Sequence, residues 1–169
     1  MDLNPPAQAG TGTGAAADAS RTAAASAAAE RLRRSSFGAV CALLLQYGLG
    51  MGVSLFVNVP DKDQGKGMGA SFGNAFSNGP AALAAHAGIG LLLIINVIVV
   101  LIVAIRTRLP LMVTTAVIGL LSVVGAAFSG ANFVDKGQNS ASMTMAVLTG
   151  VAIACYAINL YVLGAPRKD

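Results

Sequence analysis

The chain has 169 residues, of which 55% are hydrophobic and only 11% are charged, and its mean hydropathy is +0.70. A soluble domain carries about 25% charged residues, so this composition excludes an ordinary soluble globular protein and indicates a membrane protein. The formal net charge of +4 comes from basic residues that flank hydrophobic stretches and do not cluster on one polar face, which argues against a nucleic-acid partner.

Four long stretches contain no Lys, Arg, Asp or Glu: residues 35–60, 67–105, 109–134 and 137–166. A helix of about 20 apolar residues crosses the roughly 30 Å hydrocarbon core of a bilayer, and each stretch is longer than that. We therefore predict an all-α membrane protein, an antiparallel four-helix transmembrane bundle. Its four-span domain covers residues 36–164, with spans at about 36–58, 81–105, 109–132 and 141–164, followed by a short C-terminus at 165–169.

Residues 1–35 precede the first span and are predicted to form a cytoplasmic tail, disordered to partly helical. Met1–Gly14 contains too little apolar surface to offset its ordering entropy, which indicates disorder. From Ser20 the composition favours a helix that runs into the first span, with Glu30 and Arg34 placed to pair at i,i+4. The hydrophobic run begins only at Phe37 and is too long for a cleaved signal peptide.

The basic residues divide unequally around the four spans. Eight fall on one side, and these are Arg21, Arg31, Arg33, Arg34, Arg106, Arg108, Arg167 and Lys168. Three fall on the other, and these are Lys62, Lys66 and Lys136. Positive charge is retained on the cytoplasmic side of the cell membrane, so both termini are predicted to be cytoplasmic.

Glycines spaced four apart allow two helix backbones to approach closely. The first span contains Gly48-x-x-x-Gly52, and the third contains Gly125-x-x-x-Ser129, so these four residues are predicted to pack helices together. Between the first two spans, Met68, Phe72 and Phe76 recur every fourth residue, a spacing compatible with a short interfacial helix, although the interleaved glycines favour a loop.

Counting 1.5 Å per residue along each span places the polar side chains in two layers. The outer layer contains the only histidine, and its members are His86, Ser54, Ser129, Asn132 and Met145, with Ser142 and Thr144 alongside. The second layer runs from mid-membrane toward the cytoplasm and consists of Gln46, Tyr47, Asn96, Tyr156 and Asn159. Side chains at this depth usually form hydrogen bonds between helices, although a ligand or pore role stays open for them.

Three interpretations of His86 compete: a neutral imidazole hydrogen-bonded across the bundle, an axial haem ligand with Met145 or Met143 as the second donor, and a proton or metal site. No carboxylate lies within a span, which argues against ion-coupled transport and against acid–base catalysis. The two cysteines, Cys41 and Cys155, both lie inside spans, and their spacing fits no metal site.

Four segments carry a resemblance to known proteins: Gln46-Tyr47-x-Leu49-Gly50-Met51, Ala84-Ala85-His86-Ala87-Gly88-Ile89-Gly90, Gly130-Ala131-Asn132-Phe133 and Ser142-Met143-Thr144-Met145-Ala146. Over residues 37–163 the chain resembles small uncharacterised four-helix integral membrane proteins of high-GC Gram-positive bacteria, a group that implies no known activity. It is more remotely similar to the four-helix membrane cytochromes b, whose haem histidines lie near helix ends. His86 matches one such position, whereas the last helix carries Met143 and Met145 where those cytochromes have a second histidine.

The sequence therefore predicts a non-enzymatic integral membrane protein with a structural or accessory role. It is expected to sit in the lipid bilayer as a homo-oligomer or as part of a larger membrane complex, with no cofactor and no metal. Two alternatives stay open. One is a haem b- or quinone-linked redox subunit that uses His86, with Met145 as the second haem ligand. The other is a small permease or channel subunit.

Overall fold

The computed structural model describes residues 12–56, 65, 67–136 and 139–164. The helices in this part of the chain are α1 (Gly12–Phe56), α2 (Met68–Asn78), α3 (Ala81–Thr107), α4 (Pro110–Lys136) and α5 (Asn139–Gly164). Four of them, α1, α3, α4 and α5, are long and apolar enough to cross a membrane. The chain is thus a multi-pass membrane protein by the length and composition of its helices.

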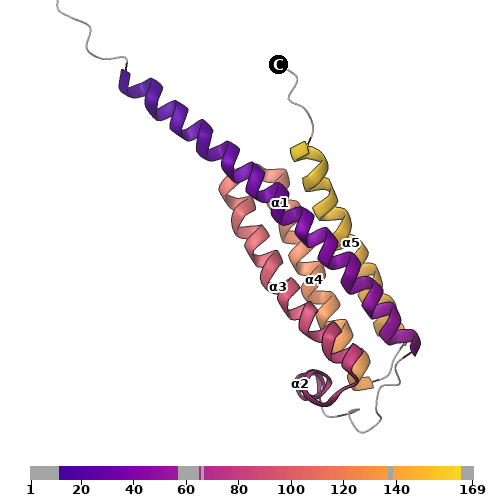
Figure 1. The fold of residues 1–169 in the computed structure, drawn as a ribbon. Coiled ribbons are helices and arrows are strands. Elements are labelled where there is room, and N and C mark those ends of the chain that lie inside the picture. The colour runs from indigo at the N-terminus through magenta and orange to yellow at the C-terminus, as the bar shows by residue number, and fades with distance from the viewer. Residues whose placement is uncertain (1–11, 57–64, 66, 137–138, 165–169) are drawn as a thin grey trace, which may run out of the picture.

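The four long helices alternate in direction and lie side by side (Figure 1), as predicted for an antiparallel four-helix bundle. α1 packs against α3 and α5, and α4 packs against the same two helices. The start of α1 and the end of α5 lie at one end of the bundle, which we call the terminal end (Figure 1). The opposite end carries α2, and we call it the α2 end.

α1 is much longer than the predicted first span, because its helix begins at Gly12 and has 45 residues. At 1.5 Å per residue it is about 67 Å long, so its N-terminal part extends beyond the other helices (Figure 1). The prediction of disorder over Met1–Gly14 is wrong for residues 12–14, and residues 1–11 lie outside the described residues. The predicted Glu30–Arg34 pair is confirmed, since Nε of Arg34 donates to Oε1 of Glu30 at 2.8 Å.

The other span boundaries differ from the prediction by a few residues. α3 continues to Thr107 and α5 begins at Asn139. α4 begins at Pro110, as expected for a residue whose missing N–H is not needed in a first turn, but it continues to Lys136 and not to residue 132. Residues 133–136 thus continue the helix, because a helix can extend past the apolar segment that spans the bilayer. Residues 57–58 and 165–169 fall outside the described part of the chain.

At the α2 end, Asp135 joins α4 to the segment before α2. The N–H of Gly67 donates to Oδ1 of Asp135 at 2.9 Å, and the N–H of Gly65 donates to its carbonyl oxygen at 3.0 Å. Both glycines have a positive φ, 77° at Gly65 and 87° at Gly67. Residues with a side chain rarely adopt this backbone conformation. Met68–Asn78 forms the helix α2 despite its interleaved glycines, and α2 is seen nearly end-on in Figure 1, so it lies across the bundle axis.

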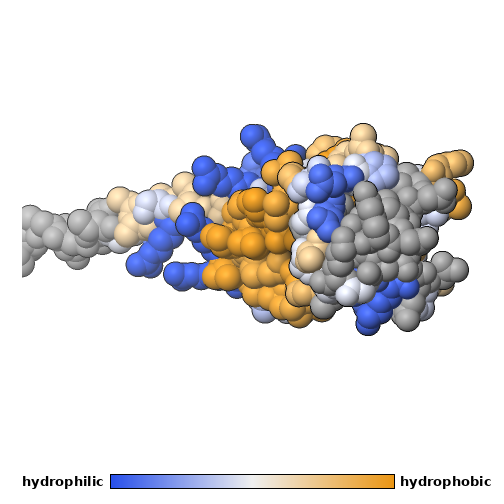
Figure 2. Space-filling view, turned by 90° about the horizontal axis from the view of Figure 1, so that it is seen from below, coloured by the Kyte–Doolittle hydropathy of each residue, from blue (hydrophilic) through white to orange (hydrophobic). Residues whose placement is uncertain are grey.

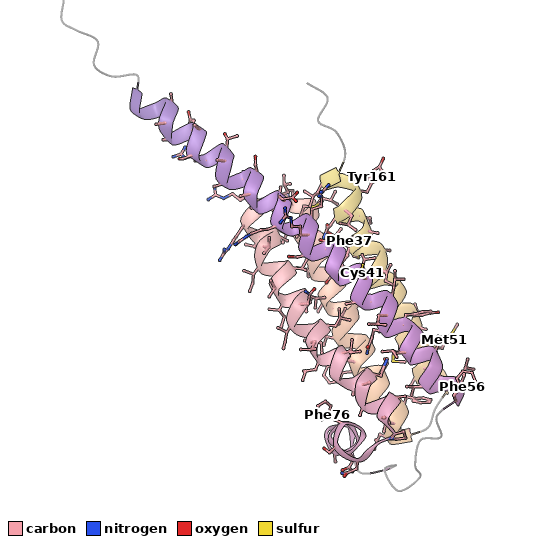
Figure 3. All side chains as sticks on the ribbon, viewed as in Figure 1. Phe37, Cys41, Met51, Phe56, Phe76 and Tyr161 are labelled. Carbon is pink, nitrogen blue, oxygen red and sulfur yellow. The ribbon has the colours of Figure 1, made fainter. Side chains whose placement is uncertain are left out.

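The terminal half of the bundle is a filled core that is mostly apolar and also buries Ser36, Thr115 and Asn159. Its largest fully buried apolar or aromatic side chains come from four helices and are Leu32, Leu43, Val97, Val100, Met112 and Tyr156. Outside this core, the surface is covered by exposed Leu, Ile, Val and Phe side chains, which form a hydrophobic band between more hydrophilic regions (Figure 2). Figure 3 shows Phe37, Met51 and Phe56 along α1, where 61%, 46% and 86% of each residue is exposed, as suits a surface in contact with lipid or with another protein.

Candidate functional site

The candidate site is built on a reciprocal contact between α1 and α3. On α1, Gln46 and Gly50 are four residues apart and share a face; on α3, His86 and Gly90 do the same. A methyl group built at Gly50 would lie 3.0 Å from Cε1 of His86, and one built at Gly90 would lie 3.0 Å from Nε2 of Gln46. Because the helices run antiparallel, each glycine provides the space for the polar side chain of the other helix. We call these four residues the clasp.

The hydrogen bonds of the clasp define the state of His86. Nε2 of Gln46 donates to the backbone oxygen of His86 at 2.8 Å, which fixes the orientation of the amide because a carbonyl oxygen only accepts. The same amide nitrogen lies 3.3 Å from Nε2 of the His86 ring. That ring nitrogen must then accept, so the proton of the neutral imidazole is on Nδ1. The clasp therefore matches the first interpretation of His86, a neutral imidazole bonded across the bundle.

Two polar atoms of the clasp are buried without a hydrogen-bond partner among the described residues: Nδ1 of His86 and Oε1 of Gln46. One is a donor and the other is an acceptor. Leaving such a group unsatisfied costs about 1–3 kcal/mol. The clasp thus leaves one donor and one acceptor available for a further partner.

The clasp forms part of the wall of a cavity of about 140 Å³, which lies in the half of the bundle toward the α2 end. All four long helices line this cavity, and most of its wall is apolar, including Val53, Leu83, Leu93, Val123, Ala126 and Val134. Its lining residues with polar side-chain atoms are Gln46, Tyr47, Ser54, His86, Ser142 and Thr149. An apolar cavity with a few convergent polar groups is typical of a site for a small molecule.

α4 and α5 close the cavity opposite the clasp through small residues. A methyl group at Gly130 would lie 3.3 Å from Sδ of Met145, and one at Gly125 would lie 3.0 Å from Cδ1 of Leu148. Met145 lines the same cavity as His86, as the depth count predicts. Gly125 is confirmed as a packing residue, whereas its predicted partner Ser129 is half-buried and does not line the cavity.

The predicted packing of helices through Gly48 and Gly52 is wrong within the chain. A methyl group at either position would have no atom within 4 Å apart from the adjoining backbone of α1. Gly50, which lies between them, is buried against His86. The four-residue spacing that matters in α1 is that of Gln46 and Gly50, which lie on the face toward α3, and not that of Gly48 and Gly52. The signal that could have found the clasp is the pairing of Gln46-x-x-x-Gly50 with His86-x-x-x-Gly90 in two antiparallel helices.

The other predicted polar residues fall in several places. Oγ of Ser54 lies 3.4 Å from Oγ of Ser142, which links α1 to α5 at the α2 end. Asn132 is half-buried and does not line the cavity. Oδ1 of Asn96 is buried without a partner among the described residues. Gln46, which the depth count put in the second layer, contacts His86 of the outer layer, because a long side chain reaches across the layers.

Two further second-layer residues, Tyr156 and Asn159, lie in the terminal half, whereas Tyr47 lines the cavity. Oγ1 of Thr115 donates to Oδ1 of Asn159 at 2.5 Å, and both residues are buried. Tyr156 is fully buried against Gly119, where a methyl group would lie only 2.7 Å from its Cζ. These side chains fill the terminal half of the bundle, so the cavity does not continue through it.

The described residues contain no group of three or more His, Cys, Asp or Glu side chains that could hold a metal ion. Cys155 is buried and Cys41 is exposed, and both are free thiols. The chain matches no known family model, no curated protein and no solved structure. The resemblances drawn from the sequence therefore stay predictions, and the functional argument rests on the cavity and the clasp.

Proposed function

We propose that this chain is a non-enzymatic integral membrane component that holds a small lipophilic molecule in the cavity beside His86, in an accessory role within a larger membrane assembly. The observation that carries the proposal is the cavity itself, which four helices line with apolar side chains and with one buried donor and one buried acceptor that have no partner among the described residues. A structural role alone would be served better by a filled core.

The size and chemistry of the cavity define the class of occupant. An apolar cavity of about 150 Å³ in another protein holds benzene, so 140 Å³ suits a single ring or a molecule of similar size. A carbonyl or hydroxyl group on that ring would pair with Nδ1 of His86 or Oε1 of Gln46. A quinone headgroup has this chemistry, so the quinone-linked alternative is compatible with the site.

A haem fits this site poorly. Sites for drug-sized ligands enclose about 300–1,000 Å³, and a haem needs more than the lower end of that range, whereas this cavity measures about 140 Å³. In addition, Nε2 of His86 accepts a hydrogen bond from Gln46, so it is not free to bind iron. A pore within one chain is not supported either, because Leu43, Val97 and Tyr156 fill the terminal half.

For its location we propose the cell membrane with both termini in the cytoplasm. The support is the excess of basic residues at the terminal end, where Arg31, Arg106 and Arg108 flank the ends of apolar helices. The exposed apolar band of the bundle leaves room for a second copy or a partner subunit.

The test is extraction of the purified protein, in mild detergent, with organic solvent followed by mass spectrometry. A small molecule should co-purify with the wild type and be lost from Ala146→Leu, which fills the cavity. Ala154→Leu is the matched control, because Ala154 is on the same helix, α5, but is exposed. Equal recovery from both variants, or no small molecule in the wild type, would contradict the proposal.

A further inference from the structure

A basic groove lies at the terminal end, between the N-terminal extension of α1 and the end of α3. Its volume is about 710 Å³. Arg21 and Arg31 line it from α1, and Arg106 and Arg108 line it from the end of α3. The groove thus brings together four guanidinium groups from two segments that are far apart in sequence.

The nearby acids pair with Arg21, Arg33 and Arg34, of which only Arg21 lines the groove. Asp18 lies 3.8 Å from Arg21, while Glu30 lies 3.3 Å from Arg33 and 2.8 Å from Arg34. Neither acid lines the groove. Among the described residues, Arg31, Arg106 and Arg108 form no ion pair with a carboxylate. Three positive charges therefore share the groove without a counter-charge from the described chain.

Arg108 also occupies an unfavourable backbone conformation. It ends α3 with φ at 57°, the left-handed region, and its N–H donates to the carbonyl oxygen of Ile105. Glycine is the usual residue at such a helix end, because any Cβ is disfavoured there. The arginine is strained at a position where a glycine would relax the backbone, which points to a role for its side chain.

The groove lies at the level where lipid headgroups are expected. The predicted first span begins at residue 36, so Arg31 lies about 7 Å beyond it along the helix. A headgroup layer extends roughly 5–8 Å beyond the hydrocarbon core on each side. Arg106 and Arg108 directly follow the apolar part of α3, and Val103 supplies an apolar wall on the bilayer side. In Figure 2, hydrophilic residues gather where the extension of α1 leaves the hydrophobic band.

We propose that this groove binds the headgroup of an anionic phospholipid from the adjoining leaflet. The guanidinium groups of Arg31, Arg106 and Arg108 bind its phosphate, for which the planar arginine fork is well suited. The small alanines of α1 that line the groove leave room for the headgroup, and Val103 contacts the start of an acyl chain. The bound lipid supplies the missing negative charge and ties the extension of α1 to the end of α3.

Native mass spectrometry of the full chain, released from detergent and titrated with phosphatidylglycerol or phosphatidylcholine, tests this inference. The wild type should bind phosphatidylglycerol more tightly. A basic residue near a charged lipid contributes about fivefold in affinity, so Arg106→Gln/Arg108→Gln should weaken binding about 30-fold. The matched control is Arg33→Gln/Arg34→Gln, which removes the same charge from residues that pair with Glu30 and do not line the groove.

Arg108→Gly separates binding from folding. It relaxes the backbone, so its thermal stability should equal or exceed that of the wild type, while its affinity for phosphatidylglycerol falls about fivefold. Equal binding of the two lipids would overturn the proposal, as would equal losses in the groove and control variants. Displacement of the lipid by inorganic phosphate at similar concentrations would indicate a site for soluble phosphate and would also overturn it.

Discussion

Adding one methyl group at Gly50 should destabilise the bundle, whereas the same change at Gly48 or Gly52 should stabilise it. A methyl group at Gly50 would lie 3.0 Å from Cε1, 3.7 Å from Nδ1 and 3.8 Å from Nε2 of His86. At Gly48 and Gly52 it would meet no such atom within 4 Å. The three substitutions are chemically identical and lie within five residues of one helix.

The expected magnitudes follow from two opposing terms. Alanine is favoured over glycine inside a helix by about 0.5–1 kcal/mol, and this gain applies at all three positions. A methyl group 3.0 Å from Cε1 of His86 forces the ring to shift from its hydrogen bond with Gln46; crowding of this kind costs about 1–3 kcal/mol, and the penalty applies only to Gly50→Ala. The free energy of unfolding of Gly50→Ala should therefore lie about 1–3 kcal/mol below that of either control.

Reversible unfolding by sodium dodecyl sulfate, followed by far-ultraviolet circular dichroism in mixed micelles, measures these differences. A second set in the His86→Ala background completes a double-mutant cycle. Without the imidazole ring, Gly50→Ala should stabilise the protein as the controls do. If Gly50→Ala stabilises the protein with the ring present, His86 does not pack on Gly50 and the clasp is wrong.

Three further changes test other contacts. Gly119→Ala should lower the free energy of unfolding by at least about 2 kcal/mol, because the methyl group would lie 2.7 Å from Cζ of the fully buried Tyr156. The same denaturation assay measures this change. If Gly119→Ala lowers the free energy of unfolding by less than Gly50→Ala does, this packing is wrong. Asp135→Ala should speed amide hydrogen exchange in α2, because the N–H of Gly67 loses its acceptor; unchanged exchange would contradict the anchoring role. The hydrogen bond from Arg34 and the charge of Arg33 lower the pKa of Glu30 below 4.5, so ionised Glu30 stabilises the extension of α1 above that pH and this contribution is lost as the pH falls further. Circular dichroism should show the corresponding loss of helix below about pH 4.5 in the wild type and not in Glu30→Gln.

The number, type and approximate bounds of the spans could be predicted from the sequence, because charged residues are excluded from lipid and their positions delimit each helix. Depth could be predicted as well, since a helix rises by a fixed distance per residue, and this placed His86 and Met145 in one layer. The rotation of each helix about its axis could not be predicted, because each helix carries apolar residues on all of its faces. The sequence therefore has no periodicity that indicates which face points inward. The spacing of Gly48 and Gly52 therefore does not indicate that Gly50 between them makes the contact.

The extension of α1 was only partly predicted for a different reason. Alanine-rich sequence favours a helix, but its glycines and threonines weaken that preference, and the continuous helix into the first span supplies the nucleus that an isolated segment would lack. The basic groove depends on this continuity. It forms because a straight α1 carries Arg21 and Arg31 past the end of α3, a relationship between distant residues that spacing along the chain does not reveal.

The most direct test of the clasp uses the fact that His86 is the only histidine in the chain. Nitrogen-15 magnetic resonance of histidine-labelled protein in lipid nanodiscs at neutral pH reports both nitrogens of this single ring. A neutral imidazole with its proton on Nδ1 and an accepting Nε2 is expected, and Gln46→Leu should shift the Nε2 resonance. A proton on Nε2, a doubly protonated ring or a metal-bound nitrogen would contradict the account.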